Sequence, residues 1–336
     1  MNITYYRQVA HCEPSKYVSE VTIKEVSPAE NSDFLERITF EEIGWNAIAK
    51  KGLYEPGTKV FFIPAETILP AELSDEMDVT KYLAKGKVRV TRLRGNRSEG
   101  LIVPREKVEP YLPYLLQWED PPSVQMKGNA CRRADIPLEF EIFYKMPNLL
   151  NETDVFDPGE SIYFSEKIHG TNTRVGFLKS PETGEYQLYV GSHRIALRQD
   201  EKNLYWRTVL SLGIKFLPDY IFYGEIFGGG VQKGMHYERA VPDILFFAAT
   251  HKGEYLAPRS FMALCSQEGI PRVKMHPTVY SGIEKARMWA DLESEYTDRH
   301  MREGVVLVSA FRPRRMAKVI GFDYLAQKDN KKTERH

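Results

Sequence analysis

The residues best suited to chemistry lie in one short segment, residues 165–174, with the sequence SEKIHGTNTR. Lys167 stands two residues before a His-Gly-Thr-Asn run, which predicts a strand end followed by a tight turn whose backbone N–H groups suit a phosphate. An amine attacks only when it is deprotonated, so a nucleophilic Lys167 needs desolvation or a nearby positive charge to lower its pKa. The segment predicts a nucleophilic lysine beside a phosphate. By spacing alone, the alternative is an ordinary surface lysine in a turn.

Four further motifs follow Lys167 in the chain. They are GSHR at 191–194, FYGEIFG at 222–228, EGVVL at 303–307 and a lysine on a predicted strand, Lys318. Taken with the Lys167 segment, this ordered set resembles the covalent nucleotidyltransferases, which are the polynucleotide ligases and the mRNA capping enzymes. The resemblance covers residues 160–325 throughout.

Two features resemble the RNA ligases in particular. The position of His169 is more often Asp in DNA ligases and capping enzymes. Those enzymes also carry an OB domain after the catalytic core, whereas 18 residues follow Lys318 here. The segments KGLYEPGTKVFFIP at 51–64 and LRGNRSEGL at 93–101 are similar to the branch with an N-terminal OB domain, the Deinococcus and Naegleria type.

The resemblance implies a catalytic role for two lysines. Lys167 would attack the α-phosphate of ATP, expel pyrophosphate and hold AMP, while Lys318 supplies a fixed positive charge at that phosphate. Lys318 and a divalent cation together would also acidify Lys167. A divalent cation would supply the second positive charge. Glu225, Glu303 and the amide oxygen of Asn172 are hard ligands suited to a hydrated Mg or Mn ion. The structural alternatives are a surface carboxylate for Glu303 and an ion pair for Glu225.

The resemblance also implies contacts with ATP. Glu166 would contact the adenine amine, and Arg194 would reach the ribose or a 5′-phosphate. His169 and Arg174 would touch phosphate or sugar, or would merely support the turn. The residues predicted to bind this cofactor are Glu166, Ile168, His169, Asn172, Arg174, Arg194, Glu225 and Phe247.

One strand departs from the family pattern. The family strand usually ends in Phe-Asp, but this sequence has Ala249 and Thr250 at those positions. The usual ring that stacks on adenine is therefore missing. Because alternate residues of a strand share a face, Phe247 should point the same way as Ala249 and replace that ring, while Phe246 packs in the core.

The composition is that of a folded globular protein. The 336 residues are about twice a typical domain, with 42% hydrophobic and 27% charged residues. The 46 basic residues balance 46 acidic ones, so a nucleic acid must be met by a local patch. Three scattered cysteines predict neither disulfides nor structural zinc, and favour a cytoplasmic location. No apolar run approaches the ~20 residues of a membrane span, so no membrane partner is expected.

The sequence predicts an α+β chain with a boundary after residue 147. Residues 1–147 would form an OB-type β-barrel domain with a connecting segment. Residues 148–336 would form an adenylyltransferase domain, an ATP-grasp-like ligase fold of antiparallel sheets with flanking helices. Predicted strands include 18–26, 45–50, 59–64 and 87–94, and predicted helices are 200–212, 260–268 and 283–296.

The densest basic stretch lies in the first domain. Residues 85–107 hold eight Lys or Arg against two Glu, and in 87–94 the basic residues alternate with Val88 and Val90. A solvated strand face is one interpretation. The other is a nucleic-acid groove that grips backbone phosphates.

The predicted function is ATP-dependent sealing of RNA 3′-OH and 5′-phosphate ends through lysyl-AMP and AMP-capped RNA, an RNA repair reaction. The partner would be RNA, as a nicked duplex or broken ends, and no protein partner is implied. One alternative is a DNA ligase or a capping-type nucleotidyltransferase. Another is a catalytically inactive RNA-binding relative, because the adenine strand is altered and one lysine of the usual Lys-x-Lys motif is absent, with Met316 and Ile320 flanking Ala317-Lys318-Val319.

Overall fold

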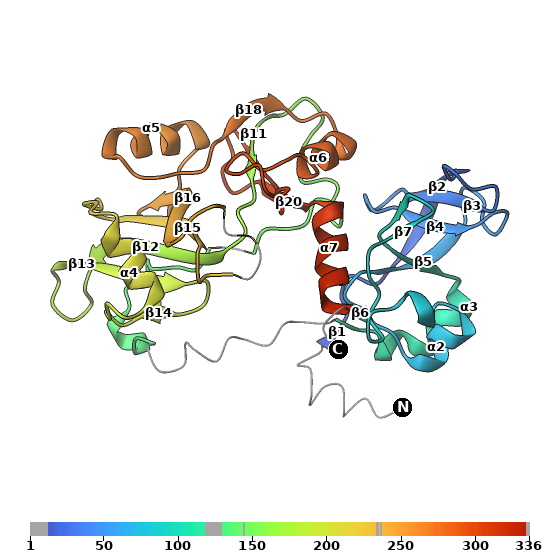
Figure 1. Cartoon of the computed structure of the whole chain (residues 1–336). Coiled ribbons are helices and arrows are strands. Elements are labelled where there is room, and N and C mark those ends of the chain that lie inside the picture. Colours follow the sequence, from blue (N-terminus) through green and yellow to red (C-terminus); the bar gives the residue numbers. More distant parts are fainter. Residues whose placement is uncertain (1–12, 118–129, 144, 233–234, 236, 334–336) are drawn as a thin grey trace. The chain divides into compact units, whose positions relative to one another are not determined.

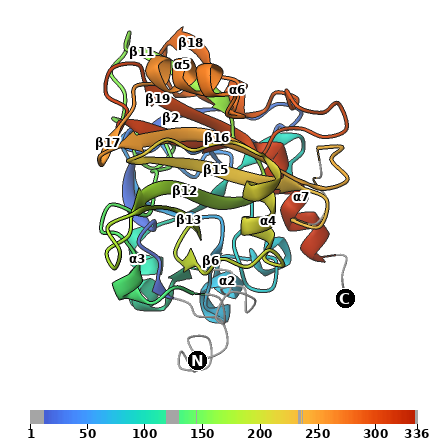
Figure 2. The same ribbon diagram turned by 90° about the vertical axis from the view of Figure 1, so that its left-hand side faces the viewer.

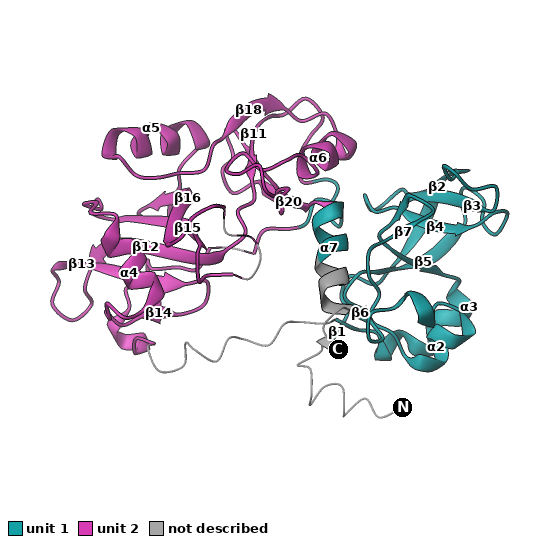
Figure 3. Ribbon diagram, viewed as in Figure 1, with its two compact units in different colours: residues 1–122, 148–154, 322–336 teal, residues 123–147, 155–321 magenta. Residues whose placement is uncertain are grey.

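The chain forms two compact units (Figures 1 and 3). The computed structural model describes residues 13–117, 130–143, 145–232, 235 and 237–333. Unit 1 comprises residues 1–122, 148–154 and 322–336, and unit 2 comprises residues 123–147 and 155–321. Each unit therefore combines segments that are distant in the sequence.

Unit 1 is built on a five-stranded antiparallel sheet in the order β4-β3-β2-β5-β9. Its strands are β2 (Ser19–Pro28), β3 (Leu35–Phe40), β4 (Ala47–Lys50), β5 (Lys59–Pro64) and β9 (Gly100–Val103). Strand β2 pairs with both β3 and β5. Beside β4 and β9, the N–H of Glu99 donates to the carbonyl of Asn46 at 3.0 Å. The two edge strands of this sheet therefore come close to each other.

The smaller elements of unit 1 pack on one hydrophobic core. Phe61 and Ile63 of β5 pack there with Leu73 and with the predicted inward residue Val88. The smaller strands are β1 (Glu13–Pro14), β6 (Thr67–Ile68), β7 (Thr91–Leu93), β8 (Asn96–Ser98) and β10 (Leu116–Gln117). The helices are α2 (Ala71–Glu76), α3 (Arg105–Val108), α7 (Phe322–Thr333) and the 3₁₀ turns η1 (Thr80–Tyr82) and η2 (Glu109–Tyr114).

The basic stretch of unit 1 is largely engaged with partners in the same unit. The predicted strand 87–94 is shorter than expected, since only β7 forms there, although Val88 and Val90 are buried as expected. Lys87 pairs with Glu66 at 2.8 Å. The side chain of Arg92 bonds Asp323 of α7 and lies over the Phe322 ring. These cations are thus partly neutralised within the chain.

Unit 2 contains two antiparallel sheets (Figure 2). The six-stranded sheet has the order β14-β13-β12-β15-β16-β17, and the four-stranded sheet has the order β18-β11-β19-β20. The strands of the first are β12 (Thr171–Lys179), β13 (Tyr186–Ser192), β14 (Ala196–Leu197), β15 (Tyr220–Gly228), β16 (Pro242–His251) and β17 (Glu254–Tyr255). The strands of the second are β11 (Ser161–Glu166), β18 (His276–Val279), β19 (Gly304–Ser309) and β20 (Met316–Ile320).

Two hydrophobic clusters cover opposite faces of the six-stranded sheet. One joins Phe222 and Phe246 to the helices α4 (Leu204–Ser211) and α5 (Pro258–Glu268). The other joins Tyr223 to Val308 and Met316 of the four-stranded sheet. The second cluster therefore holds the two sheets of unit 2 together, which confirms antiparallel sheets with flanking helices.

The helix predictions differ in accuracy. The prediction for 260–268 matches α5, which starts at Pro258 and ends before Gly269 in the left-handed conformation. α4 is shorter than 200–212, because the side chain of Asn203 caps it by accepting the N–H of Tyr205. α6 (Ile283–Ala290) stops well before residue 296. Within the described residues, no helix is long and apolar enough to cross a membrane.

Candidate active site

Lys167 lies at the end of β11, next to Glu303. Strand β11 pairs with β19, and the N–H of Lys167 donates to the carbonyl of Gly304 at 2.9 Å. This register places the Lys167 ammonium 2.8 Å from Oε1 of Glu303, with side-chain exposures of only 24% and 13%. Two predicted site residues, distant in the sequence, therefore form a partly buried ion pair.

Glu303 is held from a second side by His169. Nδ1 of His169 lies 3.1 Å from Oε2 of Glu303, and the N–H of His169 donates to the hydroxyl of Tyr237 at 2.7 Å. Burial of Glu303 would raise its pKa, but the charge of Lys167 and the hydrogen bonds from His169 and Lys167 lower that pKa to about 2. Glu303 is therefore ionised at neutral pH.

Glu225 and Asn172 face each other across β12 and β15, as directly paired residues. Gly170 permits this close approach, because a Cβ there would meet the carbonyl oxygen of Ile226 at 2.2 Å. Desolvation raises the pKa of Glu225 to about 8, and the nearby Glu303 adds to the rise. The charge of Lys167 opposes this rise, and Glu225 still binds its proton more tightly than an exposed carboxyl does.

Lys318 lies on β20, opposite Val306 of β19, and its N–H donates to the carbonyl of Pro147 at 2.9 Å. Burial lowers the pKa of Lys318, and the charge of Lys167 lowers it further. The four charged residues Lys167, Glu225, Glu303 and Lys318 are called the lysine–carboxylate cluster below.

The two nearby carboxylates set the protonation of Lys167 in the chain by itself. Burial would lower the pKa of Lys167, but the carboxylates of Glu303 and Glu225 raise it above its usual value. Lys167 is therefore held as an ammonium in the chain by itself, and the expected acidification requires the divalent cation together with Lys318. An additional cation near the two carboxylates would be needed to reverse the balance.

The donor set of this cluster fits a hydrated divalent cation. Two carboxylates and the amide of Asn172 supply oxygen ligands, and Glu225 is desolvated with no ion pair among the described residues. Within that part of the chain, no three His, Cys, Asp or Glu residues form a direct metal cage. The residues therefore fit an ion that keeps several of its own waters.

Glu166 points to the segment that follows α6. The Ser294 hydroxyl donates to its carboxylate at 2.8 Å, and the N–H of Glu295 donates at 2.7 Å. Burial raises the pKa of Glu166 in spite of these hydrogen bonds. The residue predicted to contact adenine is therefore already bonded within the chain.

Phe247 faces away from Ala249, contrary to the sequence-based expectation. Phe246 pairs with Gly224 and Ala248 with Tyr223, so Phe247 is the extra residue of a β-bulge. The bulge breaks the strand alternation. Phe246 and Ala249 consequently share one core cluster, while Phe247 packs in the other, with Phe143 at 5.1 Å.

The surroundings of Phe247 are apolar and tightly filled. A cavity of about 30 Å³ lies among its neighbours, which include Ser165 and Tyr255. This is far below the roughly 300 Å³ of a small ligand site. Phe247 also packs against the cluster that contains the buried Ile168. The predicted stacking ring therefore lies near the residue that follows Lys167.

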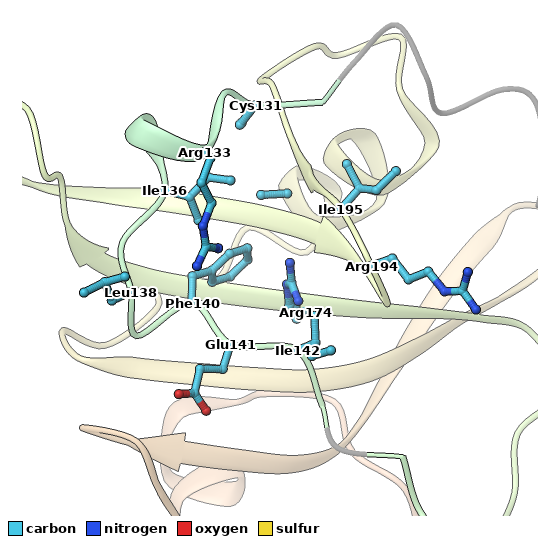
Figure 4. Close-up of a pocket in the computed structure, with 11 residues that line it drawn as sticks. Cys131, Arg133, Ile136, Leu138, Phe140, Glu141, Ile142, Arg174, Arg194 and Ile195 are labelled. Atoms are coloured by element: carbon cyan, nitrogen blue, oxygen red, sulfur yellow. The ribbon is translucent and has the colours of Figure 1, made fainter.

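Arg174 and Arg194 lie at a larger pocket, of about 580 Å³ (Figure 4). Arg174 is 4% exposed, and its guanidinium lies 4.6 Å from the centroid of the Phe140 ring. Arg194 is exposed. The pocket lining does not include Lys167, Glu225, Glu303 or Lys318. These two arginines are thus grouped together, apart from the lysine–carboxylate cluster.

Sequence reasoning missed several residues of this region. Tyr237 bonds the turn at His169, and Ser294 bonds Glu166. The charge of Lys145 acts on both Lys318 and His193. None of these belongs to a recognised motif, and Lys145 lay in a stretch interpreted as a connection. Only tertiary contacts reveal them.

The region around Lys167 matches a known protein family. The RNA ligase family model matches residues 160–320. The structure resembles Naegleria gruberi RNA ligase with pyrophosphate, with TM-score 0.72, 18% identity, and coverage of 94% of this chain and 99% of that chain. It also resembles a variant of that ligase with ATP and Mn (TM-score 0.73, 19% identity, coverage 94% and 100%).

A third similar structure is a variant of the same ligase with AMP and Mn (TM-score 0.73, 18% identity, coverage 94% and 100%). No curated protein matches the chain in sequence. The fold is therefore shared over nearly the whole chain, at low sequence identity.

Proposed function

We propose that this chain is an ATP-dependent RNA ligase with Lys167 as its nucleophile, and the match of the RNA ligase family model to residues 160–320 supports this proposal. ATP is the AMP donor, Mg or Mn is the metal, and the substrates are RNA 3′-OH and 5′-phosphate ends in a nicked duplex or at a break. The similar Naegleria gruberi structures with ATP, AMP and Mn support the choice of nucleotide and metal.

One observation carries this proposal. The amine of Lys167 contacts Glu303 at 2.8 Å. The charge of Glu225 raises the pKa of Lys167, and the charge of Lys167 lowers the pKa of Lys318. A nucleophile, a second cation and two hard oxygen ligands thus meet in one place. Adenylyl transfer requires this combination, because negative charge builds on the α-phosphate as it is attacked.

The proposed ligation reaction has three steps. First, the Lys167 amine loses a proton and forms a P–N bond to the α-phosphorus of ATP, while the bond to pyrophosphate breaks. Next, an oxygen of the RNA 5′-phosphate attacks the same phosphorus, the P–N bond breaks and the amine is restored. Finally, the RNA 3′-OH loses its proton and attacks the activated 5′-phosphate, and AMP leaves.

The residues of the lysine–carboxylate cluster control the proton on Lys167. Glu303 holds and orients the amine, but it also stabilises the unreactive ammonium form. A divalent cation near Glu303, Glu225 and Asn172 would supply positive charge that offsets both carboxylates and the α-phosphate. Lys318 adds a fixed positive charge, and burial lowers the pKa of this ammonium group.

Adenine recognition is assigned to Glu166, Ile168 and Phe247. Phe247 packs against the Ile168 cluster, but the cavity of about 30 Å³ among its neighbours is too small for a base, so stacking on adenine would require these neighbours to move. The raised pKa of Glu166 supports a carboxyl that exchanges hydrogen bonds with a base. Arg194 is assigned to the ribose or the 5′-phosphate.

We further propose that residues 1–147 contain an OB-type barrel with a connecting segment, and that residues 148–336 contain the adenylyltransferase. The strand order β4-β3-β2-β5-β9 and the approach of β4 to β9 support a five-stranded barrel of this kind. The barrel would contact backbone phosphates of the RNA.

The test is formation of the covalent adduct. The full chain is incubated with α-labelled ATP and Mn, denatured and separated by electrophoresis. We expect label on the wild-type protein and none on Lys167→Ala, while Lys179→Ala at the far, exposed end of β12 keeps the label. A wild-type protein without label would refute the proposal, as would a Lys167→Ala protein that retains it.

Two additional arms separate the alternative functions. A capping-type enzyme would take label from α-labelled GTP, and a DNA ligase would seal nicks with all-DNA ends. We expect ATP and an RNA 3′-OH end to be preferred in both comparisons.

A further inference from the structure

The larger pocket of unit 2, whose lining is separate from the lysine–carboxylate cluster, is rich in arginine. Arg133, Arg174 and Arg194 line it together with Phe140, and these four residues are called the arginine pocket below. Figure 4 shows Arg133 and Arg174 on either side of the Phe140 ring, whereas Arg194 extends away from them. All four residues belong to unit 2.

Arg174 is a buried cation that lacks a counter-charge. Its Nε and Nη1 atoms are buried and have no hydrogen-bond partner among the described residues. Desolvation lowers its pKa to about 10, and the charge of Arg133 adds to this effect. A buried guanidinium without partners is costly for a fold, so its presence indicates that a ligand supplies the missing acceptor.

The electrostatic surroundings favour an anion. Desolvation lowers the pKa of His193, and the charges of Arg194, Arg174, Lys145 and Lys318 lower it further. Positive charge therefore extends from Lys318 to the arginine pocket. Glu141 is the single carboxylate of the pocket lining, and in Figure 4 its side chain points away from the guanidinium groups.

The pocket also offers apolar surface at its rim. Leu138 is 80% exposed and Ile142 is 52% exposed, and both line the pocket. A volume of about 580 Å³ lies within the range of small-ligand sites. The combination of guanidinium groups, an aromatic ring and apolar side chains suits a phosphate that carries a sugar and a base, more than it suits an inorganic anion.

We propose that the arginine pocket binds one nucleotide of the RNA substrate, with Arg174 and Arg133 on its phosphate. The assignment rests on the proposed ligase function. RNA is favoured over ATP because the pocket lining excludes all four residues of the lysine–carboxylate cluster, where the α-phosphate of ATP must lie. Arg174 thus serves the nucleic acid instead of the cofactor that the sequence suggested.

The test measures RNA binding without catalysis. Fluorescence anisotropy gives the Kd of a labelled, 5′-phosphorylated single-stranded RNA for the full chain without ATP. Arg133→Gln should raise the Kd about tenfold. It should also reduce the slope of log Kd against log salt by about 0.7 for a lost phosphate contact. Arg174→Met, which keeps the volume of the buried side chain, should raise the Kd by a similar factor.

Arg132→Gln is the matched control, because Arg132 precedes Arg133 but is 80% exposed, pairs with Asp135 at 3.2 Å and lies outside the pocket lining. We expect its Kd and salt slope to equal those of the wild type. If Arg133→Gln and Arg132→Gln weaken binding equally, the pocket is not the site. If Arg174→Met does not fold, Arg133→Gln and its salt slope still decide the question.

A second arm distinguishes RNA from ATP. The rate of lysyl-AMP formation from α-labelled ATP is measured beside the sealing of pre-adenylylated RNA. We expect the ratio of sealing to adenylylation to fall about tenfold in Arg133→Gln. An equal fall in both rates would overturn the assignment in favour of an ATP subsite. A wild-type protein that binds RNA through the pocket but forms no adduct would refute the ligase proposal alone.

Discussion

The lysine–carboxylate cluster and the arginine pocket lie in the same unit but treat charge in opposite ways. In the cluster, the ammonium of Lys167 meets the carboxylate of Glu303 at 2.8 Å, so opposite charges are paired within the chain. In the pocket, Arg174 is 4% exposed, and its Nε and Nη1 have no hydrogen-bond partner among the described residues. The first site is complete without an anion, whereas the second lacks an acceptor.

This difference suits the lysine–carboxylate cluster to catalysis and the arginine pocket to ligand binding. A paired nucleophile is well positioned but unreactive, because Glu303 and Glu225 raise the pKa of Lys167. The amine becomes reactive only when another cation also binds the carboxylate of Glu303. An unpaired guanidinium has no chemistry to perform, but it gains most when a phosphate arrives. We therefore expect substitutions in the cluster to act on reaction rates, and substitutions in the pocket to act on affinity.

The largest effect is expected from removing the paired carboxylate. Glu303→Gln should slow lysyl-AMP formation at least about 100-fold, as for loss of a group that stabilises the transition state. Single-turnover labelling with α-labelled ATP measures this rate. Loss of the counter-charge should also lower the pKa of Lys167, so the residual activity should rise at a lower pH than in the wild type. Glu284→Gln on α6 is the control, and a change below threefold in Glu303→Gln would contradict the role.

A smaller effect, on stability, is expected at the turn behind the cluster. Gly170→Ala places a Cβ 2.2 Å from the carbonyl oxygen of Ile226, which should lower the free energy of unfolding by about 3 kcal/mol. Gly184→Ala, with φ of +73° and open space around it, should cost only about 1 kcal/mol. Urea denaturation compares the two. Equal losses would show that the close strand approach is not required.

The pH dependence of stability tests whether Glu225 is uncompensated. Its pKa rises from 4.5 to about 8 on folding, so the folded state binds more protons than the unfolded state between these values. Its contribution to stability therefore falls as the pH rises through this window. In metal-free buffer, the Tm of Glu225→Gln should rise relative to the Tm of the wild type as the pH increases from 5 to 8. A gap that stays constant would mean that Glu225 is ionised throughout.

The smallest effect is expected from the unpaired arginine. Arg174→Met removes a buried charge that has no partner and keeps an apolar side chain against Phe140, so the Tm should equal or exceed that of the wild type by a few degrees. Differential scanning calorimetry measures it. A clear fall in Tm would show that Arg174 stabilises the fold by itself, which would weaken the contrast between the two sites.

The sequence predicted β5 and α5 well, whereas the regularly alternating stretch 87–94 forms only the short strand β7. β5 has the expected limits, because Lys59–Pro64 is a continuous β-branched and aromatic run next to Pro56 and Gly57. Phe247 was placed on the wrong face, because a bulge depends on the partner strand and leaves no local signal. The predicted domain boundary divides the chain once, after residue 147. In the structure, residues 148–154 and 322–336 belong to unit 1 with the N-terminal part of the chain.

The sequence by itself determined which residues could perform the chemistry, because the order of Lys167, Glu225, Glu303 and Lys318 is written in the motifs. Tertiary structure alone decided which charges meet. The pairing of β11 with β19 brings Glu303 to Lys167 across more than 130 residues of chain. Arg174 lies in the other sheet of unit 2, on β12, where its Nε and Nη1 are buried near Phe140 without a hydrogen-bond partner among the described residues. Charge compensation depends on distance and on access to water, and neither quantity exists before the sheets have formed.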